Sequence, residues 1–315
     1  MQKSLKHTIN FMLFLFVCLF SGCSLFQTTK MEQGIASYED GRYITAIEYF
    51  TQAIWDDPTD AELYFLRGNA KVKLNWIQEA IQDYTVAVRL DPEIKYFLNR
   101  GLTYLEMDDY KKALNDFNQA LLIDDENSVL YFNRGYTEAL MKDYSSAIQD
   151  YTKAISLDST NAKIFVNRGD LWANVGENQK AIFDFTAAIT INRKDELAYY
   201  NRAKEFSKIG MLDQAIEDYS QAILLNPVNT EYYFLRGELK VNTGSFTEAA
   251  SDYTKIIDLE PENGNAYYNR GICYANMEMK DFACSDFNTA GDLGFFEAYE
   301  VIKNFCNPEK KVKKK

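Results

Sequence analysis

Three columns of residues recur along this 315-residue chain with a period of 33 or 34 residues. The first column is always alanine, and the residue four positions later is always Phe or Tyr. Twelve positions before each alanine stands a glycine, or in one unit Ala203. Such a period is typical of arrays in which each unit packs only on its neighbours. It therefore predicts one elongated domain of eight units, marked by Ala46, Ala80, Ala113, Ala147, Ala181, Ala215, Ala249 and Ala283.

Each unit has the hydrophobic spacing of two short helices. In residues 128–161, apolar residues follow a helical period over 130–140, and again over 145–157, with a break near Lys142. We interpret every unit as a helical hairpin. The glycine and alanine columns are expected where the two helices approach most closely, and the aromatic column is expected to fill the space between hairpins.

Two charged columns accompany the small residues. An arginine precedes the glycine column in seven units, and an aspartate precedes the aromatic column in seven units. We expect them to pair within or between hairpins, beside the Gly/Ala contact, because a charge repeated at one place in seven of eight units has an architectural task. The residues are Arg67, Arg100, Arg134, Arg168, Arg202, Arg236 and Arg270, with Asp83, Asp116, Asp150, Asp184, Asp218, Asp252 and Asp286.

The combined columns resemble the tetratricopeptide repeat family over residues 27–295. In the last unit the family pattern is met by Tyr267, Gly271, Tyr274, Ala283, Phe287 and Ala290. The resemblance implies an all-α, right-handed superhelical solenoid of about eight helix-turn-helix repeats, in which the first helix of every hairpin lines a concave groove. A capping helix is expected over 296–306, where Phe295, Phe296, Tyr299, Ile302 and Phe305 form an apolar stripe.

The N-terminus has the features of a secretory signal, with a basic start and a short apolar run over 9–20. The segment before Cys23 resembles the lipobox of bacterial lipoproteins. The resemblance implies a signal peptide over 1–22, lipidation of Cys23 and a linker over 23–26. An uncleaved anchor and an ordinary cleaved signal are the alternatives, although the apolar run is short for a membrane span. Ser24 favours the outer membrane under the enterobacterial sorting rule.

The formal net charge of the chain is −12. Without Lys3, Lys6 and the basic tail over 307–315, the repeat body carries −18. Such a body repels phosphate backbones, so nucleic-acid binding is not expected. The lysine-rich tail is expected to be a disordered end.

The cysteines form separate groups. Beyond Cys18 and Cys23, three lie near the C-terminus: Cys273, Cys284 and Cys306. Buried free thiols are the default interpretation for these three, and a disulfide between two of them is the alternative that an oxidising envelope permits.

Features of catalysis are missing from the sequence. The single histidine, His7, lies in the predicted signal peptide, so the mature chain has none for acid–base chemistry or metal binding. No Gly-rich phosphate loop follows a strand, and the cysteines lack CxxC spacing. We therefore expect no enzyme, no cofactor, no metal site and no small-molecule substrate.

Candidate binding residues lie on the first helices. Asparagines there resemble family members in which the amide grips the backbone of an extended peptide, because an amide both donates and accepts; satisfying neighbouring polar groups is the alternative. An apolar patch beside a basic stretch would suit a peptide with a hydrophobic anchor and an acidic neighbour. Cover by the adjacent hairpin is the alternative for the patch. The predicted groove residues are Asn99, Leu102, Leu105, Asn133, Tyr136, Leu140, Lys163, Asn167, Asn201, Lys204 and Lys208.

One binding mode of the family is not expected. Its clamp for a C-terminal carboxylate needs lysines at places that here hold Phe65, Leu98, Phe132 and Val166.

The leading hypothesis is a non-enzymatic protein-binding scaffold, held in a bacterial envelope as a lipoprotein. A periplasmic chaperone or adaptor that binds many client segments is the second. A purely structural spacer is the third.

Overall fold

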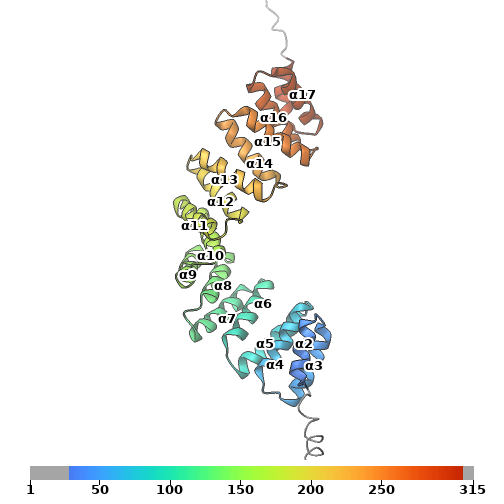
Figure 1. Ribbon diagram of the computed structural model, residues 1–315, viewed down its shortest axis with the longest axis vertical. Helices are drawn as coiled ribbons and strands as arrows, with labels where there is room; N and C mark the ends of the chain where they lie inside the picture. The colour runs from blue at the N-terminus through green and yellow to red at the C-terminus, as the bar shows by residue number, and fades with distance from the viewer. Residues whose placement is uncertain (1–27, 308–315) are drawn as a thin grey trace, which may run out of the picture. The chain divides into compact units, whose positions relative to one another are not determined.

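The computed structural model describes residues 28–307, and every regular element in that range is helical. Seventeen α-helices and one π-helical turn follow one another there, with no strand among the described residues (Figure 1). The predicted all-α repeat fold is confirmed. The signal peptide, Cys23 and the basic tail lie outside the described residues and stay predictions.

The helices follow one another as eight consecutive helix-turn-helix repeats. Each pairs an earlier helix with the next one along the chain, and a short terminal helix with a π-helical turn follows the last pair. The pairs are α2 (Lys30–Glu39) with α3 (Tyr43–Asp56), α4 (Ala61–Lys73) with α5 (Ile77–Leu90), α6 (Ile94–Glu106) with α7 (Tyr110–Ile123), α8 (Ser128–Leu140) with α9 (Tyr144–Leu157), α10 (Ala162–Asn174) with α11 (Asn178–Ile191), α12 (Glu196–Lys208) with α13 (Leu212–Leu225), α14 (Thr230–Asn242) with α15 (Phe246–Leu259), and α16 (Gly264–Asn276) with α17 (Lys280–Asp292), followed by α18 (Glu297–Val301) and η1 (Ile302–Cys306).

The hairpins belong to two compact parts of the chain. From here on, the first unit and the second unit mean these two parts and not single repeats. The first unit comprises the described residues up to Thr137, and the second begins at Glu138, so the limit lies within α8. None of the described helices is both long enough and apolar enough to cross a membrane.

Aromatic rings explain the glycine column. A Cβ added to Gly101 would lie 2.7 Å from the ring of Phe117, and one added to Gly169 would lie 2.8 Å from the ring of Phe185. The glycine is therefore small because the ring of its own hairpin occupies the place of a side chain. The sequence predicts close approach of the two helices at this column. The structure shows that the close contact at the glycine is made by a particular aromatic ring.

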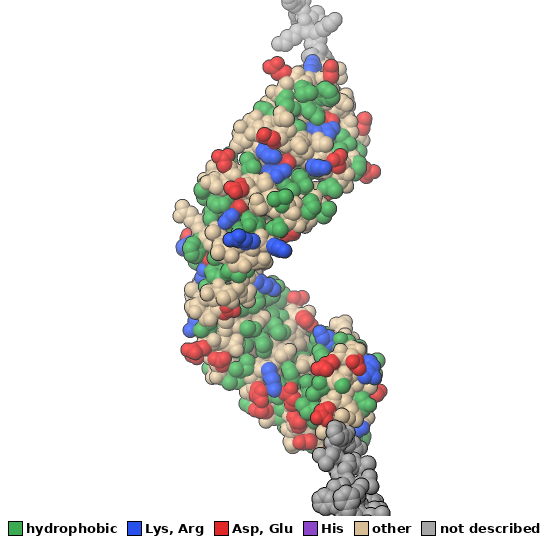
Figure 2. Space-filling model, viewed as in Figure 1, with side chains coloured by type: hydrophobic (Ala, Val, Ile, Leu, Met, Phe, Trp, Pro, Cys, Tyr) green, Lys and Arg blue, Asp and Glu red, His purple; other side chains and the backbone are tan. Residues whose placement is uncertain are grey.

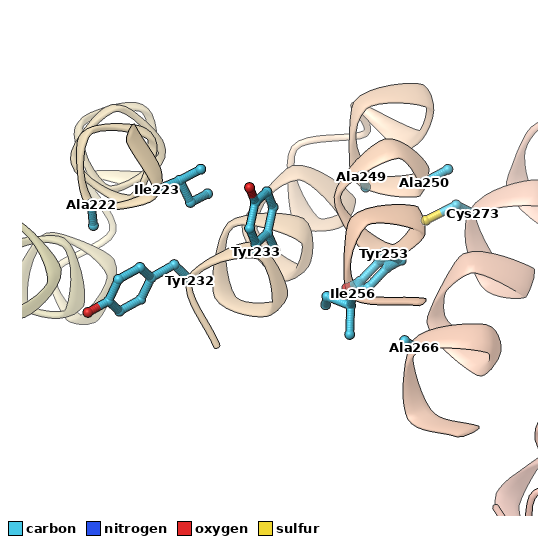
Figure 3. Packing of buried hydrophobic residues seen from close by; sticks show 10 residues of the cluster. All are labelled: Ala222, Ile223, Tyr232, Tyr233, Ala249, Ala250, Tyr253, Ile256, Ala266 and Cys273. Atoms are coloured by element: carbon cyan, nitrogen blue, oxygen red, sulfur yellow. The ribbon is translucent and has the colours of Figure 1, made fainter. Parts of the chain in front are cut away.

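The aromatic rings also contact the following hairpin, as predicted. In the second unit, Tyr253 of α15 packs in one cluster with Ala266 and Cys273 of α16 (Figure 3). The ring of Tyr253 is fully buried. One aromatic side chain therefore joins the two helices of its hairpin and the hairpin that follows.

Among the described residues, arginine and aspartate pair within the same hairpin in six hairpins; the sequence predicted the pairing but left open whether it occurs within or between hairpins. Arg168 donates from Nε and Nη2 to the two carboxylate oxygens of Asp184, at 2.8 and 2.7 Å. The aspartate is almost fully buried. Equivalent two-point pairs join Arg67 to Asp83, Arg100 to Asp116, Arg202 to Asp218, Arg236 to Asp252 and Arg270 to Asp286. Losing the arginine would leave a buried carboxylate unpaired, at a cost of about 3–5 kcal/mol.

The same arginines also bond to the preceding hairpin. Arg168 Nη1 donates to Thr152 Oγ1 on α9 at 3.0 Å, and Arg202 Nη1 donates to Thr186 Oγ1 on α11 at 3.0 Å. The other acceptors, each directly after the aromatic column, are Thr51, Thr85, Asn118, Ser220 and Thr254. Sequence analysis missed this column, although it is visible as a polar residue that follows nearly every Phe or Tyr.

The turn between the helices of a hairpin uses a left-handed residue. It is a glycine at Gly176 and Gly210, with φ near +80°. In other hairpins a residue with a side chain takes the same backbone, as at Asn75 and Asp108, with φ of 61° and 57°. That conformation is unfavourable for most L-residues, so these turns are strained relative to the glycine turns.

The C-terminal cap differs from the single helix that we predicted. After α18 the backbone widens into the π-helical turn η1. Phe295 packs on Tyr268 and Phe305 on Phe287, as expected of a cap. Phe296, however, is 78% exposed and does not cover the last hairpin. The apolar stripe therefore contributes to the cap only in part.

A disulfide fixes this cap to the last hairpin. Cys284 on α17 is bonded to Cys306 at the end of η1. The default expectation of free thiols is therefore wrong for this pair. It is correct for Cys273, which is buried and unbonded, and whose pKa burial raises to about 11.

Candidate functional site

The groove asparagines bond mainly within the protein. The side-chain nitrogens of Asn99 and Asn133 donate to the carbonyl oxygens of Lys95 and Val129, one turn earlier on the same helices, at 2.8 and 2.7 Å. Asn167 donates to the hydroxyl of Tyr151 at 3.4 Å. These amides each have a local partner, as our alternative interpretation of the column expected. Whether they also grip a peptide stays a prediction.

The predicted apolar patch varies in exposure. Leu102 and Leu105 on α6 are half-buried, whereas Tyr136 and Leu140 on α8 are each more than 40% exposed. Tyr136 and Leu140 are four residues apart, so they share one face of their helix. Two large apolar side chains are thus accessible on a single first helix.

In the first of the two compact units, a cavity of about 270 Å³ lies between α2, α4 and α6, which are the first helices of three successive hairpins. Asn99 and Leu102 line it, while Leu105 does not. Its polar groups have partners inside the protein: the hydroxyl of Tyr84 donates to Asn69 Oδ1 at 2.7 Å, and Thr103 Oγ1 donates to the Asn99 carbonyl at 2.7 Å.

In the second unit, a cavity of about 250 Å³ lies between α10 and α12, against Phe185 of α11. The structure brings the predicted residues Asn201, Lys204 and Lys208 together in its lining. Lys163, at the start of α10, is exposed and does not line it. Two acids that we did not predict complete the polar lining: Asp170 of α10 and Glu205 of α12.

Glu205 is an exception in its column. The equivalent residues, two places after the glycine column, are Ala36, Ala70, Thr103, Thr137, Leu171, Leu239 and Cys273. Glu205 is only 2% exposed. Its Oε1 accepts from the ammonium of Lys208, and its Oε2 is buried with no hydrogen-bond donor among the described residues. The carboxylate is thus half satisfied, which costs free energy in a buried site.

Asp170 is also unfavourably placed as a charged group. Burial raises its pKa to about 6, with the negative charge of Glu205 adding to the effect and Lys204 opposing it. Its Oδ1 accepts from the side-chain nitrogen of Asn201 at 2.8 Å. The cavity therefore holds two carboxyl groups that a positive hydrogen-bond donor would stabilise.

Each of the two cavity lysines has a contact within the protein, and the predicted basic stretch stays a prediction. The Lys208 ammonium is paired with Glu205, and the Lys204 ammonium lies 5.1 Å from the ring centre of Tyr200. Both side chains reach the surface, while the acids lie deeper. Figure 2 shows both cationic and anionic side chains on the visible face of the molecule. The charged residues that line the cavity are two acids and two lysines.

Glu205 could have been found in the sequence. Glu205 stands where every other unit has a small, hydroxyl or apolar residue, and the same unit carries Ala203 in the glycine column. A charge that departs from the period at a buried position is the signal that we missed.

Between residues 28 and 307, no group of three or more His, Cys, Asp or Glu side chains is arranged to hold a metal ion. Nothing in the described geometry indicates a catalytic activity.

Sequence comparison finds relatives over about a third of the chain. DnaJ homolog subfamily C member 7 from Homo sapiens is 36% identical over 96 residues, which cover 29% of this chain and 19% of that protein. The Hsp70-Hsp90 organizing protein of Triticum aestivum is 28% identical over 102 residues, covering 32% and 18%. The chain thus spans less than a fifth of these two relatives.

Solved structures share the fold. A TPR repeat-containing protein from Cytophaga hutchinsonii matches with a TM-score of 0.66 and 17% identity, over 75% of this chain and 97% of that one. YrrB, described as a TPR protein with an unusual peptide-binding site, matches with a TM-score of 0.54 and 24% identity, over 59% and 96%. At these identities the likeness concerns the fold alone.

Two profiles of the tetratricopeptide repeat match the chain directly. One matches residues 94–127, 128–161 and 197–229, and the other matches residues 61–94 and 230–263. Together they cover just over half of the sequence. The repeat hairpins and these matches agree, and the chain belongs to the tetratricopeptide repeat family.

Proposed function

We propose that this protein is a non-enzymatic scaffold for protein–protein interaction, anchored to a bacterial envelope by a lipid on Cys23. The observation that carries the proposal is the exposure of Tyr136 and Leu140 on one face of α8. Large apolar side chains that are accessible side by side on a first helix suit the anchor residue of an extended segment.

Two further observations support the envelope. The sequence before Cys23 has the form of a lipoprotein signal. The Cys284–Cys306 disulfide suits an oxidising compartment such as the periplasm. We propose the outer membrane on the basis of Ser24, with no preference for its periplasmic or surface side.

A chaperone-type adaptor is the second candidate. It is favoured by the similarity to DnaJ and Hsp70-Hsp90 organizing proteins over about 100 residues. A scaffold should have one or two partners that bind tightly, whereas a client-binding adaptor should have many that bind weakly and should suppress aggregation.

Co-purification from gently solubilised envelopes, followed by mass spectrometry, tests the proposal. The wild type is compared with a Tyr136→Ala, Leu140→Asp double variant whose fold is checked by circular dichroism. We expect one or two partners to be lost in the variant, since both side chains are exposed and their replacement leaves the core intact. An identical set of partners in both samples would place binding elsewhere, and no partner in either would favour a spacer.

The anchor has its own test. Cys23→Ala should move the protein from the membrane fraction to the soluble fraction. Full membrane retention of this variant would contradict lipidation at Cys23.

A further inference from the structure

The cavity of the second unit contains a buried acceptor without a donor. Glu205 Oε2 lies in a carboxylate that is 2% exposed, and none of the described residues donates to it. Glu205 is one of the residues that line the cavity. Buried acceptors in native structures are nearly always satisfied, which makes this oxygen a candidate ligand contact.

A second acid lies in the same cavity. Asp170 faces it from α10, and the acid's pKa is about 6 because burial disfavours its charged form. A positive charge placed between the two carboxyl groups would relieve both costs. Lys208 satisfies one oxygen of Glu205 only, and Lys204 has no carboxylate within ion-pair distance among the described residues.

We propose that this cavity binds the cationic side chain of an arginine or lysine from an extended polypeptide segment. Glu205 Oε2 and the carboxylate of Asp170 accept its N–H groups, and the guanidinium of arginine suits two acceptors better than an ammonium does. Charge complementarity points the same way, because the body between residues 28 and 307 carries a net charge of −18. The inference rests on the proposed function, in that the side chain belongs to a bound segment.

A set of matched peptides tests the proposal. The probes are capped nonapeptides of alternating Ala and Ser with one central residue: arginine, its neutral isostere citrulline, or glutamate. Each is titrated into the ¹⁵N-labelled full chain in detergent micelles at pH 7.5, where Asp170 is ionised, and amide shifts on α10 and α12 report binding. The arginine peptide should bind at least about tenfold more tightly than the citrulline peptide, since a charge-assisted hydrogen bond is lost in the latter.

Variants locate the site. Glu205→Leu places the residue of Leu171 and Leu239 in the same column, so it should fold, and it should weaken the arginine peptide about tenfold or more. Glu205→Gln tests the charge at constant shape. Asp213→Asn, an exposed acid on α13 outside the cavity, is the matched control and should bind like the wild type.

Three results would overturn the proposal. They are equal binding of the arginine and citrulline peptides, tighter binding of the glutamate peptide, and unchanged arginine binding by both Glu205 variants. If one of these results is obtained and the chain still captures partners from envelopes, the cation site is contradicted but the scaffold function is not. Loss of those partners in the Tyr136, Leu140 double variant, by contrast, tests the scaffold without touching Glu205.

Discussion

The cavities of the two units are built at equivalent places of the repeat but differ in what they leave unsatisfied. Each cavity lies between the first helices of successive hairpins and against one ring of the aromatic column. Counted from the glycine and aromatic columns, the equivalent residues are Asn69 and Asp170, Tyr84 and Phe185, Leu102 and Lys204, Thr103 and Glu205, and Glu106 and Lys208.

The difference lies in the hydrogen bonds. In the first unit, Tyr84 supplies a hydroxyl to Asn69, and Thr103 bonds to its own helix. In the second unit, Phe185 has no hydroxyl, and Glu205 keeps one oxygen without a donor among the described residues. The same backbone thus gives one cavity in which Asn69 and Thr103 have hydrogen-bond partners within the protein. In the other cavity, one oxygen of Glu205 has no donor among the described residues. Repetition of the fold does not mean repetition of the site.

The largest effect on stability is expected from placing a glutamate in the first cavity, at the position equivalent to Glu205. Thr103→Glu buries a carboxylate at a residue that is 4% exposed, where the equivalent of Lys208 is Glu106 and gives repulsion instead of a salt bridge. The free energy of unfolding should fall by about 3–5 kcal/mol. Urea denaturation followed by circular dichroism measures it.

Thr103→Ala serves as the control, since Ala70 stands in the same column, and it should stay within about 1 kcal/mol of the wild type. If the Glu variant were as stable as this control, the two cavities would not differ in the way we describe.

The pH dependence of stability should come next in size. The folded pKa of Asp170, about 6, lies above its unfolded value of 3.8, so the folded state takes up the proton more readily. The resulting cost to stability is absent below about pH 4 and complete above about pH 6, and it amounts to about 2–3 kcal/mol. Asp170→Asn removes it, and the gain of this variant over the wild type should grow between pH 4 and pH 7.5.

Urea denaturation at four pH values across that range checks this prediction. Lys204 and Glu205 of α12 are the charged groups acting on Asp170, and both are unchanged in the variant. Asp213→Asn, on the exposed surface, should show no such growth. A gap that is constant with pH would mean that Asp170 has an ordinary pKa.

A smaller effect is expected from the aromatic hydroxyl. Tyr84→Phe gives the first cavity the ring of the second and leaves Asn69 Oδ1 without its 2.7 Å bond, so stability should fall by about 1 kcal/mol. The reverse change, Phe185→Tyr, should offer a hydroxyl to Asp170 and lower the pKa of that acid. Denaturation measures the first, and carboxyl ¹³C NMR titration measures the second. An unchanged Asp170 pKa would show that the two rings are not equivalently placed.

The smallest effect is expected at the turns. The two hairpins of the second cavity, α10–α11 and α12–α13, turn at Gly176 and Gly210, whereas two hairpins of the first cavity, α4–α5 and α6–α7, turn at Asn75 and Asp108. Asp108→Gly should stabilise the chain by about 0.5–1 kcal/mol, because glycine adopts positive φ without steric cost. Thermal unfolding measures it. Gly210→Asp should destabilise by a similar amount, and the same sign for both changes would contradict the argument.

The sequence was sufficient for the repeats and insufficient for the cavities. Periodicity predicted a second helix over 145–157, and α9 begins one residue earlier, at Tyr144. Hydrophobic spacing fixes helices because each turn must bury the same face. The Arg and Asp columns were also predicted, because charges that recur in register have one geometry in every unit.

The features that escaped prediction occur once. Glu205 and the Cys284–Cys306 bond each belong to a single unit, so no column indicates their partners. Whether the oxygen of a carboxylate has a donor depends on rotamers and on neighbours from two hairpins. Spacing along one chain does not contain that information.

The bond from each arginine to the preceding hairpin has a consequence for how such a chain evolves. Thr152 lies near the end of one unit and Arg168 near the start of the next, so the bond crosses the junction between repeats. A duplicated segment of one whole period carries its own hydroxyl and its own arginine, and both new junctions recreate the bond. Gene duplication can therefore lengthen the array without stranding a polar group.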